Sequence, residues 1–273
     1  DNPVISIDKA GHVWIFSTAH GTSRPSPIHR SKKPYDVSEF ERIEPRWTWQ
    51  GSERPLDNFS YFQIWPAPSG GFRAFFTIYK APVARTTFFM SSDDGIRWNE
   101  PACLGAIHEG HYQCSAASPK KSATAFNYHP KKKGLNWRTN LYYIETRDGG
   151  RSWQNAEGQP VPTPLTEPDN AALAADYASQ GLNVYLADLV LDSTDRPVIV
   201  YVTSRGFEPG PKNGPRLTRT ARWTGERWET RDIAPADHNY DMGSLFIEAT
   251  DDGELWRFIG PTDPGPQPWG CGG

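Results

Sequence analysis

Two histidines stand at the ends of two neighbouring strand-like segments, and their pairing is the strongest chemical signal in the sequence. His111 opens segment 111–116 and His129 closes segment 123–129, with a Pro-Lys-Lys turn between the two segments. In a tight antiparallel hairpin, the start of the first strand lies beside the end of the second. We therefore expect the two imidazoles to lie close together at one sheet edge. There they could move protons to and from a polar or anionic substrate.

Polar residues occupy the same two positions in other hairpins of the chain. Strand pairs are predicted at 4–8 with 12–17, 61–66 with 72–79, 184–191 with 198–203, and 245–249 with 255–259. The residues at the strand starts and strand ends are Tyr61, Gln63, Gln113, Tyr185, Tyr240, His20, Tyr79, Lys80, Tyr128 and Arg205. If the hairpins are equivalent, these side chains open into a single polar funnel.

The hairpins are followed by further strands at 86–91, 141–146, 218–224 and 227–232. The spacing from turn to turn is roughly 50–75 residues, within or somewhat above that of a four-stranded propeller blade. The only candidate helix is 171–179, with 168–170 as its cap.

A short motif recurs after two of these hairpins. Segments 91–98 and 146–153 both fit Ser/Thr-x-Asp-x-Gly-x-x-Trp. In such a turn the Asp side chain accepts backbone N–H groups, Gly takes a positive φ, and Trp packs back over the loop. The motif is structural, and its recurrence at blade spacing indicates a β-propeller.

The expected fold is therefore all-β, a β-propeller of four-stranded blades in one domain spanning 1–273. About four and a half blades are visible, whereas closed propellers have about 4–8. We expect a larger ring, truncated at both ends of this sequence.

Composition narrows the function classes. A net charge of −3 over 273 residues gives no basic excess of the kind that marks a nucleic-acid partner. No apolar run reaches the roughly 20 residues of a membrane span. Three cysteines make no disulfide framework, and a zinc site built from Cys114, Cys271 and the histidines lacks the usual ligand spacing. The sequence requires no metal and no cofactor.

Several segments resemble one known family. They are 24–31, 110–113, 124–130, 138–143 and 238–244. Together with the Asp motifs, they resemble the BNR/Asp-box repeat proteins that include seven-bladed ulvan lyases and rhamnosidase-type glycosidases. The resemblance implies a seven-bladed ring, a polysaccharide or oligosaccharide substrate, and an extracellular or periplasmic location.

The resemblance also suggests roles for individual residues. His111 and His129 look like the family's histidine pair, Tyr185 like its catalytic tyrosine, and Tyr240 like its second tyrosine. The family's arginine has no clear equivalent. Tyr201 falls near its expected place, and Arg205 and Arg138 are the two candidates.

The leading hypothesis is a polysaccharide lyase acting on a uronate polymer by β-elimination. The barrier to this elimination falls when the uronate carboxylate is neutralised, and we assign that role to His129 and Arg205. His111 and Tyr185 are expected to move the protons. The residues expected to bind substrate are Arg205, Arg138, Gln113, Asn127, His20 and Tyr61, with Tyr240 also available to hold a sugar hydroxyl.

Two alternatives remain open. A glycoside hydrolase ordinarily needs two carboxylates, and Asp188 and Asp241 are the nearest options. A non-catalytic propeller that binds glycan or protein is the other alternative, because fold alone does not decide function.

Overall fold

The computed structural model describes residues 3–261, which form strands and turns with one short 3-10 helix, η1 (Pro211–Asn213). The first sheet contains β1 (Val4–Ile7), β2 (Val13–Phe16), β3 (Ile28–Ser31) and β4 (Phe40–Ile43), in that order. The second contains β5 (Arg46–Trp49), β6 (Ser52–Pro55), β7 (Ser60–Pro66), β8 (Phe72–Tyr79), β9 (Arg85–Ser92), β10 (Arg97–Trp98) and β11 (Ala102–Gly105). Its inner part is the antiparallel series β7-β8-β9-β10.

The remaining sheets follow in chain order. The third contains β12 (Gln113–Ser118), β13 (Lys121–Tyr128), β14 (Thr139–Thr146) and β15 (Leu173–Ala175). The fourth contains β16 (Asn183–Leu191), β17 (Pro197–Ser204), β18 (Leu217–Trp223) and β19 (Trp228–Pro235). A hairpin of β20 (Ser244–Thr250) and β21 (Gly253–Ile259) completes the described part.

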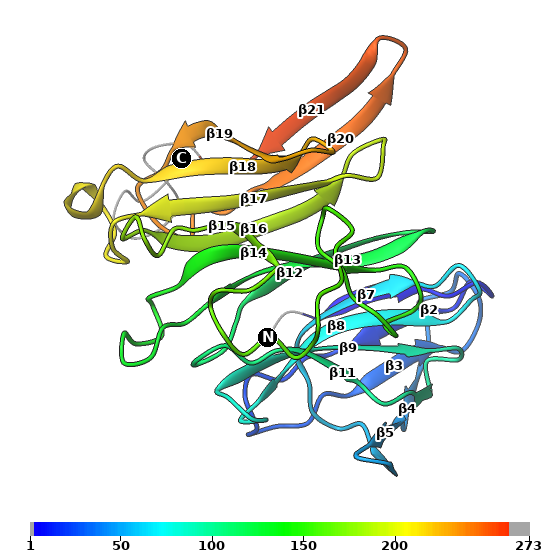
Figure 1. The fold of residues 1–273 in the computed structure, drawn as a ribbon. Coiled ribbons are helices and arrows are strands. Elements are labelled where there is room, and N and C mark those ends of the chain that lie inside the picture. Colours follow the sequence, from blue (N-terminus) through cyan, green and yellow to red (C-terminus); the bar gives the residue numbers. More distant parts are fainter. Residues whose placement is uncertain (1–2, 262–273) are drawn as a thin grey trace.

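The first strands of successive sheets lie side by side. Contacts join β1 to β7, β7 to β12, β12 to β16, and β16 to β20. Figure 1 shows the sheets following one another through the molecule, from the blue N-terminal strands to the red β21. Four-stranded antiparallel sheets that meet through their first strands are the blades of a β-propeller. The all-β propeller class predicted from the sequence is confirmed.

Each interface between neighbouring sheets has its own hydrophobic core. Trp14 and Phe16 of β2 pack with Phe72 and Trp98 of the second sheet. Further clusters join the second sheet to the third, the third to the fourth, and the fourth to β20–β21. Because strand residues alternate between the two faces, each sheet contributes to the core on both sides.

The five predicted hairpins are confirmed, each within a few residues of its expected bounds. The predicted helix over 171–179 is wrong. Residues Leu173–Ala175 form β15 against β14, and Asn140 Oδ1 accepts the N–H groups of Tyr177 and Ala178. Tertiary partners therefore take the backbone hydrogen bonds that a helix would have made. Within residues 3–261, no helix is long and apolar enough to cross a membrane.

The Asp-motif turns form as expected, with one shift in register. Asp148 Oδ1 accepts the Ser152 N–H at 2.9 Å, and Trp153 packs on Phe89 of the preceding sheet. In the first motif the hydrogen-bonding carboxylate belongs to Asp94, which accepts from Ile96 and Arg97. The sequence pattern had placed Asp93 in that role. The motif positions a turn at the end of the sheets and takes no part in the site described below.

Candidate active site

A buried arginine lies at the centre of the polar cluster. Arg138, immediately before β14, is 4% exposed, and its guanidinium carbon lies 4.0 Å from the ring centroid of Tyr112 and 4.1 Å from that of Tyr185. Its Nη2 donates to the Tyr240 hydroxyl at 2.9 Å. Its Nε is buried without an acceptor, and no carboxylate among residues 3–261 forms an ion pair with it. A buried cation without a counter-ion is costly, and such cost is often tolerated at functional sites.

The backbone of Arg138 joins two blades. Its N–H donates to Asn183 Oδ1 at 3.0 Å, and its carbonyl accepts the Val184 N–H at 2.8 Å. The guanidinium is therefore fixed where the third strand of one blade meets the first strand of the next. This explains how Tyr112, Tyr185 and Tyr240, which come from three different parts of the chain, surround it.

His129 follows β13 and lies beneath the ring of Tyr112. The ring centroids of Tyr112 and His129 are 5.2 Å apart, and the imidazole is fully buried. Neither ring nitrogen makes a well-formed hydrogen bond with the described residues. Burial lowers the pKa of His129 to about 3, with the charges of Arg138 and Arg85 adding to the effect and the main chain of Trp137 opposing it. His129 is therefore neutral at pH 7.

His111 has a different environment, although it lies where the hairpin placed it. The His129 N–H donates to the Gly110 carbonyl at 2.9 Å, so the two histidines are neighbours. His111 Nδ1 lies 2.8 Å from the Asn127 carbonyl, and its Nε2 accepts the Ile107 N–H at 3.0 Å. These bonds require the neutral Nδ1–H tautomer. Burial lowers the pKa of His111 to about 4.

The buried, doubly bonded imidazole of His111 has no nitrogen free for a substrate. We infer that this residue holds the loop before β12 in place. A Cβ atom at Gly105 would lie 2.9 Å from His111 Nε2, which shows how closely the ring is enclosed. The proton-transfer role expected for His111 does not fit this geometry.

Tyr61 and Tyr79 extend the cluster into the second blade, and His20, which follows β2, extends it to the first. The Tyr61 hydroxyl lies 3.4 Å from that of Tyr112, 3.3 Å from that of Tyr79, and 3.2 Å from His20 Nε2. Burial, followed by these tyrosine contacts, raises the pKa of Tyr61. Tyr61 has φ +50°, an unfavourable conformation for an aromatic residue, and such strain is concentrated at functional sites.

Within residues 3–261, one of the expected substrate ligands has no side-chain partner and two are already engaged. Arg205 is exposed, and its side chain makes no hydrogen bond or ion pair within residues 3–261. The Asn127 amide donates to the Val184 carbonyl and accepts the Tyr112 N–H. The Gln113 amide is bonded to the Phe76 carbonyl and to the Thr124 hydroxyl. Both amides connect strands and have little capacity left for a sugar.

The sequence reasoning missed Tyr112 and Arg85. Strand alternation had selected His111 and Gln113 as the lining pair, but β12 begins at Gln113, so the alternation does not apply to the residues before it. Arg85 begins β9, and the start of a third strand lies at the same sheet edge as the end of the second. Including third-strand starts would have found Arg85 and would have favoured Arg138 over Arg205.

The two carboxylates considered for a hydrolase both accept hydrogen bonds from backbone N–H groups. Asp188 accepts the N–H groups of Leu189 and Leu245, which ties β16 to β20. Asp241 accepts those of Asp237 and His238. Among residues 3–261, no three His, Cys, Asp or Glu side chains are grouped so that they could hold a metal ion, and Cys271 lies outside that range.

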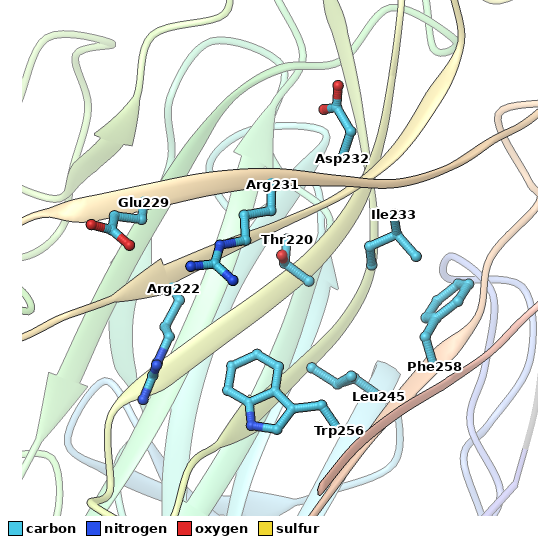
Figure 2. Close-up of a pocket in the computed structure, with 9 residues that line it drawn as sticks. All are labelled: Thr220, Arg222, Glu229, Arg231, Asp232, Ile233, Leu245, Trp256 and Phe258. Atoms are coloured by element: carbon cyan, nitrogen blue, oxygen red, sulfur yellow. The ribbon is translucent and has the colours of Figure 1, made fainter. Parts of the chain in front are cut away.

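A cavity of about 430 Å³ lies away from this cluster, between β18–β19 and β20–β21 (Figure 2). Its lining residues are Thr220, Arg222, Glu229, Arg231, Asp232, Ile233, Leu245, Trp256 and Phe258. Arg222 is paired there with Asp192 at 2.8 Å and lies over the ring of Trp256. The lining contains none of the residues expected to do chemistry, so we place the candidate active site at Arg138.

Sequence comparison finds two related proteins, both of which are named as ulvan lyases. The chain is 22% identical over 272 residues to an ulvan lyase of Pseudoalteromonas sp. (strain PLSV), covering 90% of this chain and 54% of that protein. It is 23% identical over 310 residues to an ulvan lyase of Nonlabens ulvanivorans, covering 94% and 61%. The chain thus spans little more than half the length of these relatives.

Solved structures share the fold. A polysaccharide lyase described as an ulvan lyase matches with a TM-score of 0.72 and 18% identity, covering 94% of this chain and 68% of that one. An α-L-arabinanase of Penicillium chrysogenum matches with a TM-score of 0.54 and 10% identity, covering 96% and 80%. A family model described as "BNR repeat-containing family member" matches residues 1–236, and this match shows that the chain belongs to that family.

Proposed function

We propose that this chain carries the active site of a polysaccharide lyase that cleaves a uronate-containing polymer by β-elimination. The observation that carries the proposal is the buried Arg138 guanidinium, which has three tyrosine rings around it and no carboxylate partner within residues 3–261. A substrate carboxylate would supply the missing counter-charge. The names of the relatives support this chemistry, and one structure in the same fold group is described as bound to -[GlcA(1-4)Rha3S]-.

Arg138 takes the role of neutralising the carboxylate. The proton at C5 of a uronate is only weakly acidic, because its removal places negative charge on the adjoining carboxylate. A fixed guanidinium in a site that excludes water stabilises that charge as it develops. Arg138 is preferred to Arg205 in this role because it contacts the rings of Tyr112 and Tyr185 and bonds to the Tyr240 hydroxyl, whereas the Arg205 side chain makes no hydrogen bond or ion pair within residues 3–261.

Tyr240 is the proposed proton carrier. Its side chain is 41% exposed, and its hydroxyl oxygen accepts the hydrogen bond from Arg138. As a phenolate, Tyr240 removes the C5 proton, and the electron pair of the C5–H bond forms the C4=C5 double bond while the C4–O bond breaks. The same proton then passes to the leaving oxygen, which returns Tyr240 to its starting state.

The other residues support this centre. The Tyr185 hydroxyl lies 2.5 Å from the Asn136 carbonyl, to which it donates, so Tyr185 is committed to holding the loop beside Arg138. His129 is covered by Tyr112 and contributes a neutral imidazole beneath the site. Anion binding to the arginines would reduce the positive field on His129 and thereby raise its pKa from about 3.

The test is an absorbance assay for unsaturated uronide products on uronate polysaccharides, ulvan among them. Replacing Tyr240 with Phe removes the oxygen that accepts the C5 proton and passes it on, and should lower the elimination rate by roughly 10²–10⁴-fold. Tyr35→Phe, at a tyrosine 79% exposed and outside the cluster, is the matched control and should leave the rate unchanged.

Other outcomes would overturn the proposal in distinguishable ways. Reducing ends that accumulate without any rise in absorbance would indicate hydrolysis. Binding of the polymer without either product would indicate a non-catalytic glycan-binding propeller.

A further inference from the structure

We propose that three residues near Tyr240 are positioning residues, which hold its hydroxyl at the Arg138 guanidinium. They are Arg216, His238 and Asn239. This inference rests on the proposed function, because Tyr240 is assigned there to carry the proton. Tyr240 lies on the loop between β19 and β20, which belongs to no strand. Side-chain contacts must therefore fix its place, and a displacement of 1 Å can cost a catalytic group roughly 10²-fold in rate.

Arg216 contacts this loop at three points just before Tyr240. It immediately precedes β18 and is 4% exposed. Its Nε donates to Asn239 Oδ1 at 2.6 Å, and its Nη1 donates to the Asp237 carbonyl at 2.7 Å. Its own carbonyl accepts the Ala236 N–H at 3.0 Å. The planar guanidinium therefore fixes the backbone and the side chain that lead into Tyr240.

Asp241 closes the loop on the other side of Tyr240. Its Oδ2 accepts the N–H groups of Asp237 at 3.1 Å and His238 at 2.9 Å, and its own N–H donates to the His238 carbonyl at 3.1 Å. Burial lowers the pKa of Arg216, and the charges of Asp241 and Asp237 oppose that effect. The charge of Arg216 is thus compensated inside the fold, which suits a residue that holds structure and does not bind substrate.

His238 contacts Tyr240 through both its backbone and its ring. Its Nδ1 accepts the Tyr240 N–H at 3.0 Å, and the two ring centroids lie 5.4 Å apart with an angle of 29° between the ring planes. On the other side, Tyr185 meets the Tyr240 ring edge-on, with the centroids 5.3 Å apart. The phenol is therefore held between two rings while its hydroxyl bonds to Arg138.

Asn239 connects Arg216 to the cluster itself. Its side chain is 1% exposed and lies against Tyr185. Burial raises the pKa of Tyr185, and the charge of Arg138 and a hydrogen bond with Asn239 oppose that effect. A continuous series of contacts thus runs from Arg216 through Asn239 and Tyr185 to Arg138, and Tyr240 is bonded to its last member.

The experiment measures the order of Tyr240 separately from turnover. Fluorotyrosine is incorporated at position 240 and its fluorine NMR signal is recorded, while kcat and KM for elimination are measured on the unlabelled protein. The wild-type protein should give one narrow resonance. His238→Phe keeps a ring that can stack but removes the Nδ1 acceptor, and Arg216→Lys keeps the charge but loses the planar fork.

Each variant should broaden or split the resonance and lower kcat roughly 10- to 100-fold. KM should change little, because the lost interactions act on the group that moves the proton and not on bound substrate. The matched controls are His29→Phe, at a half-exposed histidine of β3, and Arg54→Lys, at an exposed arginine of β6. Both should keep the narrow resonance and the wild-type kcat. Circular dichroism checks folding, and His238→Phe alone decides if Arg216→Lys does not fold.

The outcomes separate this inference from the proposed function. A narrow, unshifted resonance in the folded variants would overturn the positioning role, whatever happens to kcat. In a protein that performs elimination, a disordered Tyr240 with wild-type kcat, or a loss confined to KM, would overturn it as well. A resonance that broadens only in His238→Phe and Arg216→Lys, in a protein that yields no elimination product, would overturn the lyase proposal and leave the positioning of Tyr240 standing.

Discussion

Two buried cations at opposite ends of the third blade have opposite surroundings. At the Asp-motif end, Lys121 and Glu145 form an ion pair at 2.6 Å with side chains only 2% and 4% exposed, and Tyr143 donates to the same carboxylate oxygen. At the other end, Arg138 is equally buried, but its neighbours are aromatic rings and one hydroxyl. The first cation is satisfied by the fold itself, whereas the second is left ready for a ligand.

The contrast extends to the groups around each cation. Glu145 also accepts from Arg147 and Gln154, and its pKa is lowered by Lys121 despite the opposing effect of burial. Around Arg138, by contrast, neither ring nitrogen of His129 makes a well-formed hydrogen bond within residues 3–261. At the end of the blade that maintains structure, the buried polar groups have hydrogen-bond or ion-pair partners. At the end where we place the active site, some of them do not.

The largest expected effect is on stability at the paired end. Lys121→Met leaves buried Glu145 with only the exposed Arg147 as counter-charge and should cost about 3–5 kcal/mol in the free energy of unfolding, measured by denaturant titration. The double variant Lys121→Met/Glu145→Gln removes both charges and should recover much of that loss. A double variant as unstable as the single one would show that the pair itself, and not the stranded charge, provides the stability.

A substitution of Arg138, at the other end of the blade, should have the opposite effect on stability. Arg138→Met removes a buried charge that has no counter-ion among residues 3–261, so the midpoint of denaturation should stay the same or rise. The elimination rate should fall roughly 10²–10³-fold, as when a group that stabilises developing charge is lost. Destabilisation as large as that of Lys121→Met, with little loss of rate, would remove the distinction between the two ends.

The two neighbouring histidines allow a finer test through pH. A histidine held neutral in the fold is protonated in the unfolded chain below about pH 6.5, so its contribution to stability is lost as the pH falls. For His111, with a pKa of about 4, the loss between pH 6.5 and 4 should be about 3 kcal/mol.

His111→Gln should therefore give a flatter dependence of unfolding free energy on pH than the wild-type protein. His29→Gln, at a half-exposed histidine of β3, serves as the control and should keep the wild-type slope. Parallel curves for wild type and His111→Gln would show that this imidazole is not held neutral by the fold.

The hairpins and the repeating turn were predictable because they depend on local signals. Alternating apolar residues, Gly-rich turns and the Asp–Gly–Trp spacing determine each sheet without reference to the others. The strand β15 was not predictable, because its alanine-rich sequence has no strand signal. It forms through pairing with β14 and through the side chain of Asn140.

The site was only partly predictable for a related reason. The repeat placed His129, Tyr185 and Tyr240 at one sheet edge, and in the structure Arg138, which only the family resemblance had offered, contacts both tyrosines there. It did not show which side chains the backbone had already engaged. His111 and Asn127 look like ligands in the sequence, yet their polar atoms satisfy main-chain groups. That distinction depends on contacts between blades, which local spacing does not report.

Gly110 has a consequence for how such a protein can evolve. Because glycine has no side chain, the backbone of the third blade can contact the carbonyl of Arg85 in the second. Only glycine fits at this contact between the two blades. Repeat proteins can diversify by duplicating or exchanging whole units, but two units joined in this way must be inherited together. A chimaera that replaces one of these two blades with another blade of the chain would lose the joint even if every strand still formed.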